Sequence, residues 1–150
     1  MQTSELSTRN DGLRLARVML RLTRKLNSHV RALGGEDDLH LAEVSVLGQI
    51  ERGHDLPSLI ARALHLDPPR VTRITDRLVS LGYIERAPDA SDRRLCRLHL
   101  TPAGSRRLAT ARDDLAETME YLLEGLTDDE RQGLEEGLRG MSRVLDSADL

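Results

Sequence analysis

The sequence predicts a mainly α-helical fold with one small β-hairpin, an α+β chain. Apolar residues recur every three or four positions over most of the 150 residues, which is the spacing of one helix face. Leu, Ala, Arg and Glu are frequent, and these residues favour helix. Only the segment 83–100 alternates apolar and polar residues with the period of two that is typical of strands.

The first helix is expected from about Asp11 to Leu33, because its apolar positions recur at three and four residues. The Gly34-Gly35 pair that follows is a common end for a helix. Five arginines lie largely off the apolar stripe: Arg14, Arg17, Arg21, Arg24 and Arg31. We therefore expect an apolar face and a cationic face on this helix.

Three shorter helices are expected next, at Leu41–Arg52, Pro57–Leu64 and Pro68–Leu81. Proline suits the first turn of a helix because the N–H that it lacks would have no partner there. Asp67 precedes the third of these helices and is a predicted N-cap.

A hairpin is predicted from strands at Tyr83–Ala87 and Leu95–Leu100, with a charged turn between them. A long helix then begins at Thr101-Pro102 and reaches about Gly125. Thr127 and Glu130 have the spacing of a capping box, so a last helix is expected to begin there. Three short helices followed by a two-stranded hairpin make a winged helix-turn-helix.

The long first, fifth and sixth helices carry more apolar surface than one small core can cover. Exposed stripes of this kind usually meet a second copy of the same chain, so we expect a homodimer with two-fold symmetry. We interpret 1–150 as one chain in which 11–35 and 102–147 are dimerisation helices and 41–101 is the winged helix-turn-helix domain.

The net charge of −3 hides a strongly polarised chain. Residues 54–107 contain 10 basic and 6 acidic side chains, a net charge of +4. Residues 108–150 contain 4 basic and 12 acidic side chains, a net charge of −8. The middle segment is therefore the part that could face a polyanion, and the acidic tail would be kept away from it.

Several classes of function are disfavoured by the sequence. No apolar run approaches the roughly 20 residues of a membrane span, and the polar N-terminus does not look like a signal peptide, so we expect a cytoplasmic protein with no membrane partner. Cys96 is the only cysteine, which excludes an intrachain disulfide. No metal, hydrolase, phosphate-loop or dinucleotide motif occurs, so we expect no enzyme, no cofactor and no metal site.

The helix predicted at Pro68–Leu81 presents Arg70, Arg73 and Arg77 at i, i+3 and i+7. In a winged helix-turn-helix the outer face of this helix enters the major groove of DNA, where arginine can donate two hydrogen bonds to guanine. Pro69 and Thr72 could contact thymine methyl groups or phosphates. On the helix alone, a solvated charged face is an equally good interpretation, and the hairpin behind it favours DNA.

Five motifs in order carry a family resemblance: Leu59-Ile-Ala-Arg-Ala-Leu64, Val71-Thr-Arg-Ile-Thr-Asp-Arg-Leu78, Leu81-Gly-Tyr-Ile-Glu-Arg86, Asp89-x-x-Asp92-Arg-Arg94 and Leu100-Thr-Pro-Ala-Gly104. With them, the sequence resembles the MarR family of bacterial transcriptional regulators over nearly its whole length. The resemblance implies a homodimeric winged-helix protein that binds double-stranded DNA at an inverted-repeat operator. Most often such a protein is a repressor that a small molecule or oxidation releases from DNA.

The resemblance also implies site residues in the hairpin turn, the wing. Arg94 matches the family's wing arginine and Asp92 the aspartate that orients it, which a charge-assisted pair would do. A wing arginine suits the narrow minor groove, where negative potential is concentrated. Phosphate contacts are expected from Arg86 and Arg93, and from Ser58 and Arg62 on the preceding helix. An ordinary charged hairpin tip is the alternative.

By the same resemblance, a pocket for a small-molecule effector would lie between the dimerisation helices and the winged domain. The candidates are Leu22, Leu26, Val30, Val44 and Met119, each of which is also an ordinary core position. Two alternative functions stay open. One is an architectural DNA-binding protein without an effector. The other is a redox-responsive regulator using Cys96, which lies near Arg94 and Arg97, cations that favour a reactive thiolate. For Cys96, a small buried residue is the favoured interpretation.

Overall fold

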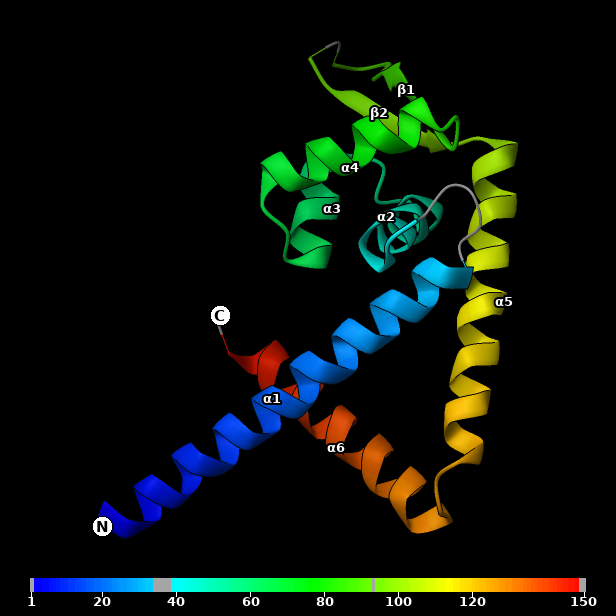
Figure 1. Cartoon of the computed structure of the whole chain (residues 1–150). Coiled ribbons are helices and arrows are strands. Elements are labelled where there is room, and N and C mark those ends of the chain that lie inside the picture. The colour runs from blue at the N-terminus through cyan, green and yellow to red at the C-terminus, as the bar shows by residue number, and fades with distance from the viewer. Residues whose placement is uncertain (1, 34–38, 93, 149–150) are drawn as a thin grey trace. The chain divides into compact units, whose positions relative to one another are not determined.

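The computed structural model describes the backbone of residues 2–33, 39–92 and 94–148, and the side chains of 10–29, 39–92 and 94–148. Its elements are α1 (Gln2–Leu33), α2 (Leu41–Glu51), α3 (Pro57–Leu64), α4 (Pro68–Ser80), β1 (Ile84–Pro88), β2 (Cys96–Leu100), α5 (Pro102–Glu124) and α6 (Asp128–Ser147) (Figure 1). The chain is thus mainly helical with one small antiparallel sheet, as predicted. It forms two compact units, residues 1–112 and 113–150, and each is described by itself below.

The core of the first unit is built around α2. Five consecutive residues of this helix, Val46–Ile50, are buried, so every side of its second half is covered. Helices α3 and α4, both strands and the start of α5 contribute the surrounding apolar side chains, which are Ile60, Val71, Leu78, Ile84, Leu98 and Leu108. This core makes the winged helix-turn-helix self-contained, because its apolar faces are satisfied within the unit.

The hairpin pairs Ile84 with Leu100, Arg86 with Leu98, and Pro88 with Cys96. The inward positions Ile84 and Leu98 are buried in the core, while the turn between the strands extends away from it (Figure 1). Alternation therefore sets which face of the hairpin packs on the helices.

The Thr101–Gly104 motif fastens the start of α5 to the turn that follows α4. The Thr101 hydroxyl donates to the Gly82 carbonyl over 2.6 Å and accepts from the Gly104 N–H over 3.0 Å. A Cβ at Gly104 would lie 1.9 Å from the Tyr83 carbonyl oxygen, so only glycine fits there. Gly82 itself has a φ of 72°, which also favours glycine.

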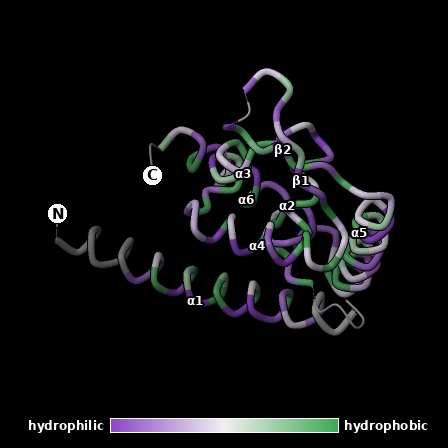
Figure 2. Tube along the Cα trace, turned by 90° about the horizontal axis from the view of Figure 1, so that it is seen from above, coloured by the Kyte–Doolittle hydropathy of each residue, from purple (hydrophilic) through white to green (hydrophobic). Residues whose placement is uncertain are grey.

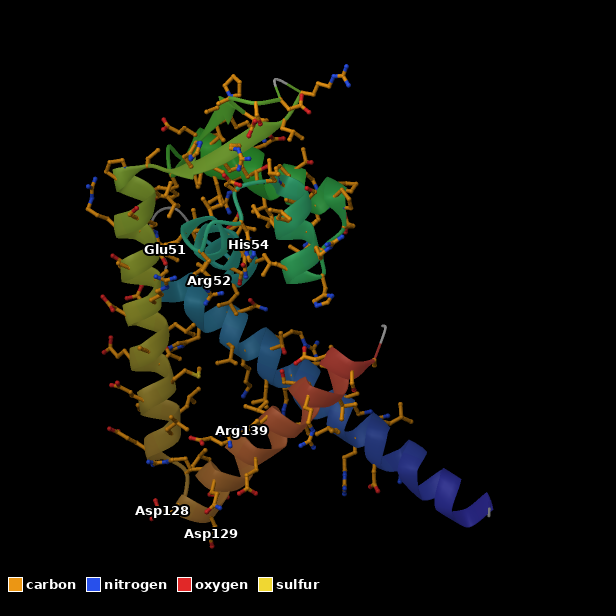
Figure 3. All side chains as sticks on the ribbon, turned by 180° about the vertical axis from the view of Figure 1, so that it is seen from behind. Glu51, Arg52, His54, Asp128, Asp129 and Arg139 are labelled. Carbon is orange, nitrogen blue, oxygen red and sulfur yellow. The ribbon has the colours of Figure 1, made fainter. Side chains whose placement is uncertain are left out.

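Both predicted N-caps are confirmed. The Asp67 carboxylate accepts from the Arg70 N–H over 2.8 Å at the start of α4. Thr127 and Glu130 form the capping box of α6, whose first turn also holds the labelled Asp128 and Asp129 (Figure 3). The pKa of Glu130 is lowered, first by the Thr127 backbone N–H and then by its hydroxyl.

One boundary prediction is wrong by nine residues. Helix α1 begins at Gln2 rather than at Asp11, because Gln2–Asn10 contains neither proline nor glycine and nothing ends the helix there. The other described boundaries agree within one residue. The predicted helix end at Gly34-Gly35 lies outside the described residues.

The long terminal helices differ from the core elements in what they bury. Leu13, Leu15 and Leu20 of α1 are each at least half exposed, and apolar and polar residues alternate along this helix (Figure 2). Helix α6 has no buried residue, although Leu134, Leu138 and Leu145 recur along one side. None of the described helices combines the length and the apolar character that crossing a membrane requires.

Candidate nucleic-acid interface

Helix α4 separates its apolar and polar residues onto opposite faces. Val71, Ile74 and Leu78 are buried against the core, whereas Arg70 and Arg73 are exposed. Pro69 and Thr72, the other predicted contacts of this helix, are exposed as well. Because Asp67 caps the helix and two prolines fill its first turn, this outer face is held on a well-formed helix end.

Arg77 does not share the environment of Arg70 and Arg73. Its guanidinium forms an ion pair with Glu43, a carboxylate that is only 4% exposed. Glu43 also accepts from the backbone N–H of His40 over 2.7 Å at the start of α2. The predicted arginine stripe therefore divides, because the second half of α4 lies beside α2 and a buried carboxylate there requires a cation.

Arg86, a predicted phosphate contact, joins β1 to α4. Its guanidinium donates to the Asp76 carboxylate over 2.6 Å and to the Thr75 hydroxyl over 3.1 Å. These contacts fix the angle between the hairpin and the helix, so the side chain already has a structural role.

The wing is ordered by a different contact from the one expected. Asp92 accepts from the backbone N–H of Arg94 over 3.0 Å. Among the described residues, no ion pair involves the guanidinium of Arg94, which is exposed. The predicted guanidinium pair is thus wrong, because a carboxylate two residues away closes an Asx-type turn on the backbone instead. The neighbouring candidate Arg93 lies outside the described residues.

Helix α3 carries the two remaining predicted contacts. Ser58 in its first turn and Arg62 one turn later are both exposed, while Ile60 between them is buried in the core. Side chains spaced by four residues share one helix face, so Ser58 and Arg62 lie on the same outer side of α3.

Most acidic residues of 54–107 form ion pairs or hydrogen bonds with other residues of the fold. Asp55 and Asp89 both pair with Arg97, Asp76 pairs with Arg86, Asp67 caps α4 and Asp92 binds the wing backbone. Within the part of the chain that the structure describes, Arg62, Arg70, Arg73 and Arg94 form no side-chain ion pair. The fold thus engages most carboxylates of this region, while these four arginines stay available to a ligand.

Sequence spacing does not predict the pairing of Arg97 with Asp55 and Asp89, which lie 42 and 8 residues away. Asp89 is 5% exposed, and its pKa is held well below its usual range, first by the Ser91 hydroxyl and then by Arg97. The pKa of Arg97 is raised in turn, first by its hydrogen bond to Asp55 and then by Asp89. Asp89 and Arg97 therefore each favour the charged state of the other.

The predicted effector residues differ in burial where the structure describes their side chains. Leu22 is exposed, Leu26 and Val44 are half-buried, and the side chain of Val30 lies outside the described residues. Met119 belongs to the second unit, where it is half-buried. The first unit has an open groove whose lining includes several charged side chains: Arg24 from α1, Glu43 near the start of α2, and Arg70, Arg73 and Arg77 from α4.

Cys96 does not have the buried position that we favoured. It is exposed at the start of β2, opposite Pro88. The reason is that β2 projects beyond the core at this end, so burial begins only at Leu98.

The residues 37–95 match the model of the MarR family. Over 137 residues, the chain is 29% identical to the transcriptional repressor MprA of Escherichia coli K12, covering 88% of this chain and 77% of that protein. It is 31% identical over 93 residues to PapX of Escherichia coli, an HTH-type transcriptional regulator, covering 60% of this chain and 57% of PapX.

Solved structures agree with these sequence matches. A MarR variant from Escherichia coli, solved in complex with operator DNA, superposes on this chain with a TM-score of 0.74 and 27% sequence identity. The superposition covers 88% of this chain and 96% of MarR. Wild-type apo MarR gives a TM-score of 0.71 at 26% identity, over 85% of this chain.

Proposed function

The chain belongs to the MarR family, and on that premise we propose that it is a dimeric, sequence-specific DNA-binding transcriptional regulator. In this proposal the protein represses transcription from an inverted-repeat operator in the bacterial cytoplasm, and a small-molecule effector releases it. It needs no catalytic group and no cofactor for this role.

The observation that carries the proposal is the cationic outer face of the winged region. Arg70 and Arg73 are exposed on α4, and Arg94 is exposed on the wing beside it. Most carboxylates that would weaken this face bind partners within the fold. A helix and a neighbouring wing that both present guanidinium groups suit adjacent major and minor grooves of one duplex.

The residues divide into roles by what they already contact. We assign base recognition to Arg70 and Arg73, with Pro69 and Thr72 beside them, and minor-groove insertion to Arg94. Ser58, Arg62 and Arg93 are our candidates for phosphate contacts. For Arg77, Arg86 and Asp92, the existing contacts support a role in holding α4, β1 and the wing turn in place.

Dimerisation would position two copies of α4 in successive major grooves, about 34 Å apart. The exposed apolar stripes of α1 and α6 support a second copy as the partner. An effector that prefers another spacing of the two helices would shift the population away from DNA. Leu22, Leu26, Val30, Val44 and Met119 remain our predicted lining for its pocket.

The proposal is tested by selecting duplexes from a random-sequence library with the purified protein and measuring affinity for the selected duplex by fluorescence anisotropy. The wild-type protein should prefer an inverted repeat and should lose affinity steeply with salt. Arg73→Ala should lower the affinity by about 5- to 150-fold, corresponding to about 1–3 kcal/mol, and relax the base preference.

The matched control is Arg139→Ala, which removes an exposed arginine from α6 that is labelled in Figure 3. Its affinity should stay within about twofold of wild type, because surface substitutions away from a site have small effects. A protein that enriched no sequence over random duplex would support the architectural alternative. Equal affinities of wild type and Arg73→Ala would reject the assignment of α4.

A further inference from the structure

Arg97 connects two parts of the chain that lie far apart in sequence. Its Nη1 donates to Asp55 Oδ2 over 2.6 Å, and Asp55 lies in the turn between α2 and α3. Its Nε donates to Asp89, the residue directly after β1. One planar guanidinium therefore spans a carboxylate of the helical part and a carboxylate of the wing, and its fork fixes the direction of both.

Asp89 uses its other oxygen to build the wing turn. Its Oδ1 accepts from the backbone N–H groups of Ser91 over 2.7 Å and Asp92 over 2.8 Å, and from the Ser91 hydroxyl over 2.5 Å. Since these bonds and Arg97 all favour the ionised carboxylate, the pKa of Asp89 lies far below its usual range. The ionised carboxylate of Asp89 thus organises the turn, and Arg97 binds its other oxygen.

Backbone contacts continue this connection on both sides. The Leu98 N–H donates to the Asp55 carbonyl over 2.8 Å, which anchors β2 to the turn between α2 and α3. Within the wing, the Leu95 N–H donates to the Asp92 carbonyl over 2.9 Å, and Asp92 accepts from Arg94. An unbroken series of contacts therefore runs from Asp55 through Arg97 and Asp89 to the exposed Arg94.

We propose that Arg97, held between Asp55 and Asp89, is a positioning residue that presents the wing arginine Arg94 to DNA in a fixed orientation. The proposal rests on the DNA-binding function proposed above and adds residues that contact no DNA themselves. A two-stranded hairpin has little stability alone, so its turn would otherwise have to be ordered on binding. Ordering it in advance reduces the entropy lost when the complex forms.

A double-mutant cycle with Asp55→Asn and Arg94→Ala tests this proposal on the selected operator duplex. Asn keeps the shape of Asp55 and removes its charge, so the core beneath it is disturbed little. We expect Asp55→Asn to weaken binding about 5-fold in the wild-type background, because residues in one network couple by about 2- to 150-fold. In the Arg94→Ala background the same substitution should change the affinity by less than about twofold, because the side chain that it positions is absent.

A purely structural role predicts a different result. Equal losses in both backgrounds, or no loss in the wild-type background, would overturn the positioning role while operator binding by the wild-type protein persists. If Arg94→Ala bound the operator duplex as tightly as wild type, Arg94 would not contribute to DNA affinity, and the proposal would also fail. Failure of the wild-type protein to bind any selected duplex would instead reject the proposed function itself, and this proposal with it.

Hydrogen exchange provides a measurement that needs no DNA. The amides of Ser91 and Asp92 should exchange about tenfold faster in Asp55→Asn, because the support behind Asp89 is weakened. Arg97→Lys should give an intermediate result, since an ammonium keeps the charge but lacks the fork that spans two carboxylates. Unchanged exchange at both amides in Asp55→Asn would contradict the proposal.

Glu51→Gln is the matched control. Glu51, labelled at the end of α2 in Figure 3, pairs with Arg112 over 2.7 Å in the same unit, and this ion pair involves no described residue of the wing. Breaking this ion pair should leave operator affinity and the exchange of Ser91 and Asp92 within about twofold of wild type. An equal effect of Glu51→Gln and Asp55→Asn would mean that any ion pair of the unit acts alike, which would overturn the specific role of Arg97.

Discussion

The winged region, residues 39–112, and the long terminal helices α1 and α6 differ in how much of their aliphatic surface they bury. In the winged region aliphatic side chains from α2, α3, α4 and the hairpin form one buried core, and several arginines are left exposed. In α1 and α6 the described aliphatic side chains are largely exposed, and ordinary surface pairs such as Arg14–Asp11 join the charged ones. The first region can hold its shape alone, whereas the second is incomplete without further apolar surface.

This difference indicates where specificity and assembly reside. Charged groups that the fold does not need can be directed at a ligand, and the winged region has such groups in Arg70, Arg73 and Arg94. Apolar groups that the fold does not bury can be directed at a second copy, and α6 has such groups in Leu134 and Leu138. The two regions therefore divide the proposed function into recognition and dimerisation.

The largest effect is expected from Leu138→Glu, which tests whether the exposed apolar residues of α6 bind a second copy of the chain. Leu138 is 56% exposed, and Glu retains helix propensity, so α6 should persist. Each copy would lose the burial of one leucine side chain at the interface, which is worth about 1.5–3 kcal/mol. The dissociation constant of the dimer should therefore rise by about 100-fold or more. Sedimentation equilibrium should give twice the 16.8 kDa chain mass for wild type and a single chain for the variant.

Gln132→Glu is the control for that substitution, because it adds the same charge two residues from Leu134 on the other side of α6. It should leave the protein dimeric. A wild-type protein that sedimented as one chain at micromolar concentration would remove dimerisation from the account and leave the exposed stripes without a role.

The next largest effect is expected on the stability of the winged region. Leu98→Ala should lower the free energy of unfolding by about 2–5 kcal/mol, because Leu98 is fully buried among the core side chains of both strands and α2. Leu134→Ala, made together with Leu138→Glu to remove the dimer, should cost less than about 0.5 kcal/mol. Urea unfolding followed by circular dichroism measures both. Similar costs at the two positions would mean that α6 packs as tightly as the core.

The elements could be predicted because their signals are local. Asp67 accepts from a residue three positions later, and Thr127 and Glu130 bind each other across the same distance, so sequence spacing alone identifies both caps. The motifs around Gly82 and Gly104 were also recognisable. Their physical reason, a close approach of two backbones, emerges only when the segments are seen together.

The contacts of the charged side chains could not be predicted in the same way. Arg77 and Glu43 are 34 residues apart, and Arg97 and Asp55 are 42 apart, so helix or strand periodicity carries no information about either pair. Arg77 occupies the same helix face as Arg70 by spacing, and only its position beside α2 separates their roles. The sequence thus predicted the surface on which arginines gather, and tertiary packing decides which of them remain exposed.

A smaller effect, which sharpens the comparison, is the acid sensitivity of the wing. Because the folded pKa of Asp89 lies below the ordinary value of 3.8, the ionised carboxylate stabilises the fold above about pH 4. That contribution is lost as the pH falls from there toward the lowered pKa. Asp89→Asn should therefore be less stable than wild type at pH 7, and the difference should shrink between about pH 4 and pH 2.

Urea midpoints measured across this range test the prediction, with Asp113→Asn as a control that neutralises an exposed carboxylate of the second unit. The control should follow the wild-type curve at every pH. A constant difference between wild type and Asp89→Asn from pH 7 to pH 2 would show that the loss comes from the acceptor oxygen that an amide lacks rather than from the charge.

The smallest effect is expected at Cys96, an exposed residue of the winged region. Its thiol is exposed at the wing end of β2, and the chain has no second cysteine with which it could form an intrachain disulfide. Oxidation to a sulfenic acid would therefore add a polar group that faces water and displaces no core side chain. Cys96→Ser should bind the selected duplex within about twofold of wild type, with or without hydrogen peroxide. If peroxide weakened the wild-type protein tenfold and spared Cys96→Ser, the wing would be an oxidation sensor as well as a DNA contact, and the redox-responsive alternative would replace release by a small molecule.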